Sequence, residues 1–176
     1  MKHNNTKSLH IILRLFLLLN IFILANFREY DKLPISALLL LEEDILVALK
    51  CYQPGYGVWS FEGRNDGDIK NISNTYYVRK GLNGDYSISL EWSVKRGYYW
   101  RVKNYKLILD QYDGSDLFKQ ESSFIPVPGV EDYHLLSLRS VKYPKHYVRH
   151  KDGEMVISKS SKDVFYPDAT WYVYLV

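Results

Sequence analysis

Short runs in which hydrophobic and polar residues alternate recur along most of the chain. Leu136–Ser140 reads Leu-Ser-Leu-Arg-Ser, and a further short run covers Glu154–Ser158. Alternation with a period of two is typical of β-strands that bury one face. Turn-forming residues separate the runs, as at Lys151-Asp152-Gly153. The pattern therefore predicts an all-β protein.

The runs repeat with a fixed period. Arg101 and Arg149 are 48 residues apart, and Phe124 and Trp171 are 47 apart. The sequence of each later copy predicts four strands in the same order. An alternating strand is followed by an aromatic strand that ends in Arg, a third strand after a tight turn, and a final strand after a polar loop such as Asp110–Asp116. A fixed period over most of a short chain defines a repeat architecture.

A shortened first copy precedes the other two. Leu46–Cys51 matches the first strand of the later copies, and Asn74–Val78 matches the last. Three copies of four strands predict a β-trefoil over residues 46–176, because a closed barrel leaves no exposed sheet edge. The copies span about residues 46–84, 85–132 and 133–176.

The N-terminus differs from the rest of the chain. A polar start with two Lys is followed by the apolar run Leu15–Ala25. This run is shorter than the roughly 20 residues of a membrane span, so residues 1–27 are interpreted as a helical signal peptide of a secreted protein. The alternatives are an uncleaved membrane anchor over residues 9–27 and a wrongly joined start of the reading frame. Residues 28–45 are interpreted as a linker or short helix.

Composition narrows the class of partner. The formal net charge of +3 is small and no Lys/Arg run reaches five residues, which argues against nucleic acid. Aromatic residues make up 15% of the chain, with 16 Tyr, and suit both strand packing and sugar contact. The single cysteine, Cys51, excludes an intrachain disulfide. We expect a monomer without a metal or cofactor.

Several segments match a known family motif. Copy three contains Tyr143-Pro144, Tyr147-Val148-Arg149-His150 and Asp168-Ala169-Thr170-Trp171, and copy two contains Gly97–Arg101 and Asp113–Phe118. These segments resemble the AbfB domain of α-L-arabinofuranosidase B, which is carbohydrate-binding module family 42. The resemblance implies a β-trefoil that binds terminal L-arabinofuranose units on arabinoxylan or arabinan.

The resemblance also implies site residues. In the family, the His of the Tyr-hydrophobic-Arg-His segment and the Asp of Asp-Ala-Thr-Phe contact the sugar. Copy three keeps both, as His150 and Asp168, with Tyr147 as a wall of the pocket. A carboxylate can accept from two sugar hydroxyls, and imidazole can donate or accept near neutral pH. The alternatives are that His150 is a surface turn residue and that Asp168 bonds nearby backbone amides.

The other two copies match the site less well. In copy two, Glu121 holds the Asp position and Val102 replaces the His, so sugar binding by Glu121 is doubtful. Copy one has Ser73 near the Asp position and no identifiable His. Arg101 and Arg149 are interpreted as structural residues that pair across strands.

Three functions remain open from the sequence. The first is a non-catalytic arabinofuranose-binding module. The second is α-L-arabinofuranosidase activity as part of a larger enzyme, although no pair of carboxylates stands out for glycoside hydrolysis. The third is a structural or protein-binding trefoil whose sugar sites have been lost.

Overall fold

The computed structural model describes residues 42–52, 75–84, 86–159 and 166–176. The chain divides into two compact units, Met1–Lys32 and Leu33–Val176, and every described residue belongs to the second. The predicted signal segment 1–27, most of the predicted linker and the middle of copy one lie outside the described residues. The described end of the linker, residues 42–45, forms a bend and a turn before the first strand.

The described residues form ten strands, which confirms the all-β class. The strands are β1 (Leu46–Cys51), β2 (Thr75–Lys80), β3 (Ile88–Trp92), β4 (Tyr98–Lys103), β5 (Lys106–Gln111), β6 (Phe124–Pro128), β7 (Leu136–Ser140), β8 (His146–Lys151), β9 (Glu154–Lys159) and β10 (Trp171–Leu175). Two short helical segments are α3 (Asp116–Glu121) and the 3₁₀ turn η2 (Tyr166–Ala169). Within the described ranges, no helix has the length and hydropathy needed to cross a membrane.

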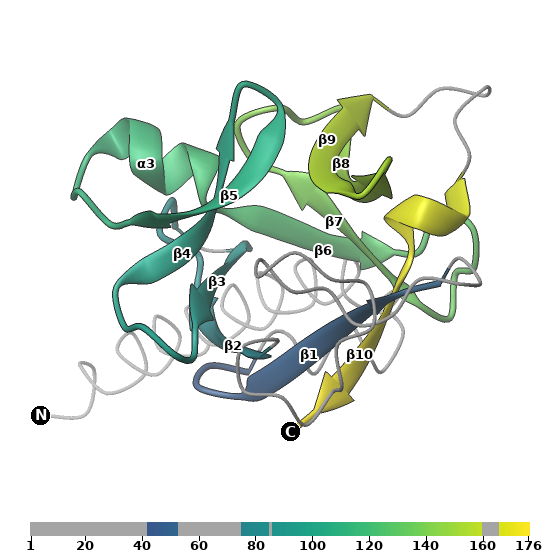
Figure 1. Cartoon of the computed structure of the whole chain (residues 1–176), viewed down its shortest axis with the longest axis horizontal. Helices are drawn as coiled ribbons and strands as arrows, with labels where there is room; N and C mark the ends of the chain where they lie inside the picture. The colour runs from purple at the N-terminus through teal and green to yellow at the C-terminus, as the bar shows by residue number, and fades with distance from the viewer. Residues whose placement is uncertain (1–41, 53–74, 85, 160–165) are drawn as a thin grey trace, which may run out of the picture. The chain divides into compact units, whose positions relative to one another are not determined.

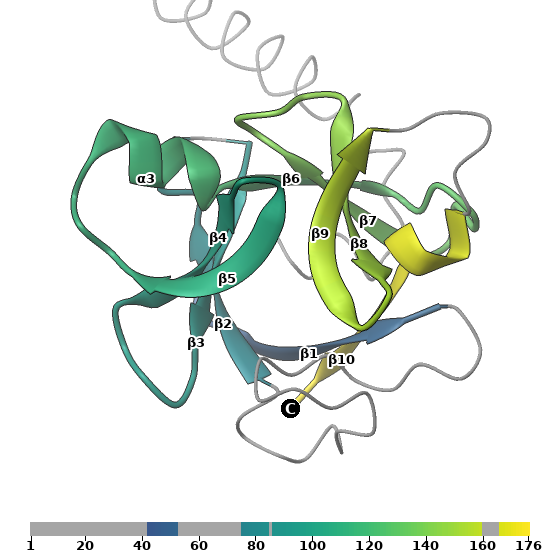
Figure 2. The same ribbon diagram turned by 45° about the horizontal axis from the view of Figure 1, so that its top comes forward.

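Six of the strands form a closed circuit. In order they are β1, β2, β3, β6, β7 and β10, and β10 pairs again with β1; every pairing is antiparallel (Figure 1). The hairpins β4–β5 and β8–β9 extend from this circuit and touch each other where Lys106 pairs with Val156 (Figure 2). The sheet thus closes on itself, as the argument from exposed edges predicted.

One pairing geometry occurs three times in the circuit. The first core aromatic of the last strand in each copy pairs with the first strand of the same copy. These pairs are Tyr76 with Val47, Phe124 with Ile88 and Trp171 with Leu136. A second contact also recurs. The residue just after each first strand donates its backbone N–H to a carbonyl in a neighbouring copy, and the acceptor is the residue directly before that copy's core aromatic. These bonds are Tyr52 to Thr170, Ser93 to Thr75 and Val141 to Ser123.

The core lies inside this circuit and is centred on large aromatic side chains. Tyr76, Trp100, Phe124 and Trp171 are almost fully buried. Trp100 makes edge-to-face contacts with Tyr76 at 5.1 Å and with Phe124 at 6.4 Å between ring centroids. Burial of such a side chain contributes about 1.5–3 kcal/mol, and edge-to-face geometry adds roughly 0.5–1.5 kcal/mol.

The expected polar loops contain helical turns that the strand pattern did not predict. Ser115 caps α3, since its side-chain oxygen accepts a hydrogen bond from the Phe118 N–H at 3.1 Å. A helix of this length is marginal alone, and the fully buried Phe118 anchors it to the domain. Its last residue is Glu121, which is thereby held in a buried position.

Loss of a core aromatic should destabilise the whole barrel. Phe124→Ala removes a fully buried ring from the packing around Trp100, and we expect it to lower the free energy of unfolding by about 3–5 kcal/mol. Urea unfolding followed by tryptophan fluorescence measures the change. Leu117→Ala, at a side chain that is half exposed, is the control and should cost less than about 0.5 kcal/mol. Equal losses in the two variants would contradict this description of the core.

Candidate functional site

In copy three, a buried carboxylate meets an arginine. Asp168 lies in η2, which packs against β8, and only 4% of Asp168 is exposed. Its Oδ2 accepts a hydrogen bond from Arg149 Nη2. Burial raises the pKa of Asp168, and the Arg149 guanidinium acts in the opposite direction. The carboxyl group is therefore held by one charged partner in a largely dry environment.

The second oxygen of Asp168 differs from the first. Oδ1 is buried and has no hydrogen-bond partner among the described residues. Buried polar atoms in proteins are nearly always hydrogen-bonded, so an open buried acceptor is a candidate ligand contact. The role of Asp168 as a ligand residue stays a prediction. A hydrogen bond from the backbone of Asp168 itself also lowers the pKa of the carboxyl group, so the alternative of a local backbone bond describes part of its surroundings.

His150 occupies an interior position of the β8–β9 hairpin. It is 3% exposed and lies opposite Met155, so the alternative of a surface turn residue is wrong. The matching pair in the β4–β5 hairpin is Val102 and Leu107, both buried and apolar. An apolar residue therefore suffices for packing at the equivalent position of copy two. Burial also lowers the pKa of His150, which keeps the ring neutral near pH 7.

Side-chain alternation along β8 places Tyr147 and Arg149 on one face and Val148 and His150 on the other. Tyr147 is partly buried, on the face from which Arg149 reaches Asp168. The role of Tyr147 as a pocket wall stays a prediction. Contact of His150 with a ligand held at Asp168 stays a prediction.

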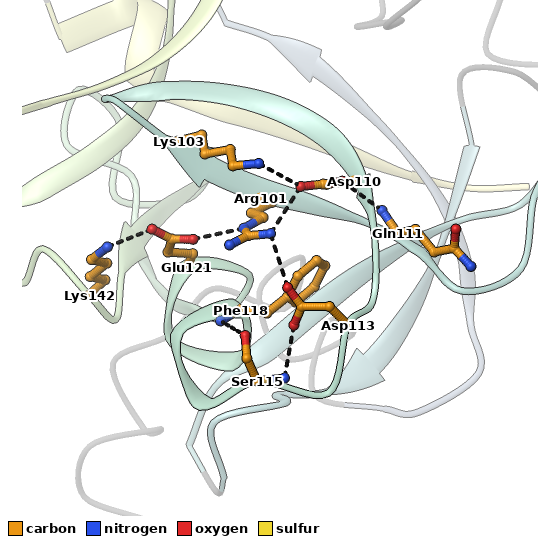
Figure 3. A network of polar contacts seen from close by, with 9 residues as sticks. All are labelled: Arg101, Lys103, Asp110, Gln111, Asp113, Ser115, Phe118, Glu121 and Lys142. Atoms are coloured by element: carbon orange, nitrogen blue, oxygen red, sulfur yellow. Dashed lines mark hydrogen bonds and ion pairs between the residues drawn. The ribbon is translucent and has the colours of Figure 1, made fainter.

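In copy two, the equivalent acid is fully engaged by cations. Glu121 is 6% exposed at the end of α3. Its Oε2 accepts from Arg101 Nε at 2.7 Å, and its Oε1 accepts from Lys142 Nζ at 2.5 Å (Figure 3). Both carboxylate oxygens thus carry a charged donor from the protein. This is the main difference from Asp168, where the described residues provide a partner for Oδ2 but not for Oδ1.

Arg101 links this acid to a wider network. Its guanidinium carbon lies 4.5 Å from the centroid of the Phe118 ring, and Nη1 lies 3.0 Å from Asp110 Oδ2 and 3.6 Å from Asp113 Oδ2. Lys103 also bonds Asp110, at 3.2 Å. The network drawn in Figure 3 therefore balances the cations Arg101, Lys103 and Lys142 against the carboxylates Asp110, Asp113 and Glu121.

The remaining positions singled out in the sequence add no contact to the candidate site among the described residues. Ser73 of copy one lies outside the described residues. Cys51 is buried in β1, and its Sγ donates to the Pro167 carbonyl at 3.6 Å. Across the described parts of the chain, no group of three or more His, Cys, Asp or Glu side chains is placed to hold a metal ion.

The two arginines have a further role that the sequence did not predict. Arg101 does pair across strands, with Asp110, but Arg149 pairs with Asp168 in η2. In both copies the arginine also bonds the acid at the family's Asp position, which is Glu121 in copy two. The signal was present in the sequence, since the arginines are 48 residues apart and the acids 47. Arg149 is thus a positioning residue for the candidate site.

Comparison with known proteins places this geometry in context. The family model described as "Alpha-L-arabinofuranosidase B (ABFB) domain" matches residues 61–173. The "Arabinofuranosidase/B-xylosidase" of Trichoderma koningii is 34% identical over 96 residues, which cover 54% of this chain and 19% of that enzyme. The chain thus matches only a small part of that relative.

Solved structures show the same fold. An arabinofuranosidase complexed with arabinofuranosyl-alpha-1,2-xylobiose superimposes with a TM-score of 0.68 at 23% identity, covering 76% of this chain and 31% of that one. A β-trefoil named BEL superimposes with a TM-score of 0.58 at 14% identity, covering 77% of this chain and 95% of that one.

Removal of the Arg149 charge should destabilise the protein in a pH-dependent way. In Arg149→Met the buried Asp168 carboxylate loses its cation, and we expect a loss of roughly 3 kcal/mol at neutral pH. Protonation neutralises Asp168 in acid, so the deficit relative to the wild type should shrink as the pH falls towards about 4. Urea unfolding at both pH values measures it.

The exposed pair between Lys106 and Glu154, at 2.8 Å, provides the control. Both side chains are more than half exposed, and Lys106→Met should cost less than about 1 kcal/mol. A deficit for Arg149→Met that stays constant with pH would show that Asp168 is not the group left unpaired.

Proposed function

The chain belongs to the alpha-L-arabinofuranosidase B (AbfB) domain family, and we propose that it is a carbohydrate-binding module for terminal L-arabinofuranose on hemicellulose, acting through copy three. The observation that carries the proposal is the buried Asp168 carboxylate. Arg149 holds one of its oxygens, and the other lacks a partner among the described residues. The family relatives are arabinofuranosidases, and one similar structure contains an arabinofuranosyl oligosaccharide.

The chemistry of this site suits a furanose. Such a sugar presents several hydroxyl groups and little apolar surface, so recognition depends on charge-assisted hydrogen bonds. Asp168 Oδ1 would accept from a sugar hydroxyl, a bond worth roughly 1.5–3 kcal/mol. Arg149 fixes the carboxylate before the sugar arrives, which reduces the entropy lost on binding. Tyr147, which lies on the same face of β8 as Arg149, would flank the ring.

We also propose that the closed sheet is a β-trefoil of three copies. The support is the pairing geometry that recurs three times around the six-strand circuit, together with the likeness to the trefoil BEL. The hairpins β4–β5 and β8–β9 would be two of the three that such a fold requires. The third would fall within residues 53–74, which lie outside the described residues.

The chain is proposed to bind sugar without hydrolysing it. Glycoside hydrolysis needs two carboxylates that face the scissile bond. Of the acids buried in the described ranges, Glu91 accepts from Arg79 and Gly97, Glu121 accepts from two cations, and Asp168 is bonded to Arg149. The matched stretch is also only 19% of the Trichoderma koningii enzyme. Catalysis in the family is therefore proposed to reside outside the region that this chain matches.

The proposed setting is extracellular. Residues 1–27 would direct secretion, or residues 9–27 would anchor the chain to a membrane, and an arabinose-containing polysaccharide would be the partner of a monomeric domain. The apolar run Leu15–Ala25 supports this proposal.

Sugar binding should depend on Asp168. We expect soluble arabinoxylan or branched arabinan to retard the wild-type protein in an affinity gel, and Asp168→Asn to abolish the retardation because the amide cannot replace a charged acceptor. Glu121→Gln is the matched control, since both oxygens of Glu121 are already bonded within the protein.

The control should be retarded like the wild type, and melting temperatures should show that all three proteins are folded. Equal migration of the wild type with and without polysaccharide would refute the binding proposal. That outcome would favour a structural or protein-binding role instead.

The purified chain should lack arabinofuranosidase activity. With 4-nitrophenyl α-L-arabinofuranoside, we expect 4-nitrophenol release no faster than in a buffer blank, because each buried acid among the described residues is already bonded to a cation. Release that is enzyme-dependent and survives repurification would establish the hydrolase alternative.

A further inference from the structure

Copy two contains most of a second sugar site, and a lysine from copy three occupies it. Tyr99 stands where copy three has Tyr147, Arg101 where it has Arg149, and Glu121 at the position of Asp168. The arginine–acid bond is present in both copies. What differs is the second carboxylate oxygen, which is open in Asp168 among the described residues and bonded to Lys142 in Glu121.

We propose that Lys142 acts as a built-in ligand that closes the copy-two site, and that its removal exposes a second site for an arabinofuranoside. This inference rests on the proposed function, because it assigns to Glu121 the sugar contact proposed for Asp168. It concerns a different residue and a different copy, so the two can be tested separately.

The geometry of Lys142 supports this role. Its ammonium donates to Glu121 Oε1 at 2.5 Å, from the side of the carboxylate opposite Arg101 (Figure 3). An N–H donor at this oxygen occupies the place that a sugar hydroxyl would need. The side chain of Lys142 is 24% exposed and that of Glu121 is 7% exposed, so the lysine is the partner more accessible to solvent. The bond to Glu121 also raises the pKa of Lys142, which keeps the donor charged.

The repeat shows that this lysine is not required by the fold. Lys142 follows Val141, whose N–H bond to Ser123 is matched by Ser93 and Tyr52 in the other copies. The residues that follow these two are Val94 and Gln53, neither of which carries a charge. In copy two the strands thus pair without a cation at this position, and the sequence of copy one has none there either. Glu121 would also keep Arg101 after the loss of Lys142, which is the arrangement that Asp168 already has.

A wall for the second site is present. The Tyr99 ring lies edge-on to Phe118 at 6.4 Å and to Tyr112 at 6.1 Å between centroids, which fixes its orientation. The counterpart of His150 is the buried Val102, and both residues lie on the face of their hairpin away from the arginine. We therefore expect the exposed site to rely on the same arginine–acid pair and tyrosine as copy three.

The test compares three variants with the wild type by isothermal titration with arabinofuranosyl-alpha-1,2-xylobiose. Lys142→Met keeps the length of the side chain and removes the donor. We expect it to bind two sugars per chain where the wild type binds one. Lys103→Met is the matched control, because Lys103 belongs to the same ion network but bonds Asp110 and not Glu121. It should bind one sugar.

The double variant Lys142→Met with Asp168→Asn separates the two proposals. It should bind one sugar through copy two, and amide chemical shifts should change at Tyr99 and Glu121 on titration. If the wild type binds no sugar and Lys142→Met binds one, the proposed function fails and this inference stands. If Lys142→Met is folded by its melting temperature and gains no site relative to the wild type, this inference is overturned, whatever the wild type does.

Discussion

Closure of the sheet is the constraint on which the rest of the structure depends. The last strand of each copy pairs both with the first strand of its own copy and with the first strand of a neighbour. Each of these pairings includes a buried aromatic residue of the last strand, so the same residues contribute to the hydrogen bonding of the circuit and to the packing of the core. No strand of the circuit is left with a free edge, and an intrachain disulfide is impossible with one cysteine.

The candidate site depends on this closure indirectly, because its elements are attached to strands of the circuit. The hairpin β8–β9 and the turn η2 are attached to the circuit at different strands, and the bond between Arg149 and Asp168 joins them. The same bond occurs in copy two between Arg101 and Glu121, where α3 replaces η2. A buried ion pair adds little net stability, since desolvation offsets most of the attraction. Its effect here is to orient a carboxylate. The second oxygen then accepts from Lys142 in copy two and has no partner among the described residues in copy three.

Much of the fold could be predicted from the pattern of residues. Alternation located strands such as Leu136–Ser140. The 48-residue period showed that β4 and β8 hold equivalent positions in their copies. The helix α3 was missed because a six-residue segment has weak intrinsic propensity, and its stability comes from burial of Phe118. The position of His150 was likewise uncertain in the sequence, where the motif does not reveal that the imidazole faces Met155 in an interior layer.

The sequence by itself determined the all-β class, the repeat and the identity of the acids at the family's Asp position. The first two follow from local alternation and spacing, which a linear chain displays directly, and the acids follow from the resemblance to the AbfB motif. Only the tertiary structure decided which carboxylate oxygen is left open. Lys142 reaches Glu121 from 21 residues away, across a boundary between copies, and Asp168 receives no such donor from the described residues. Spacing along the chain cannot reveal this difference, because the contact depends on how closure brings one copy against the next.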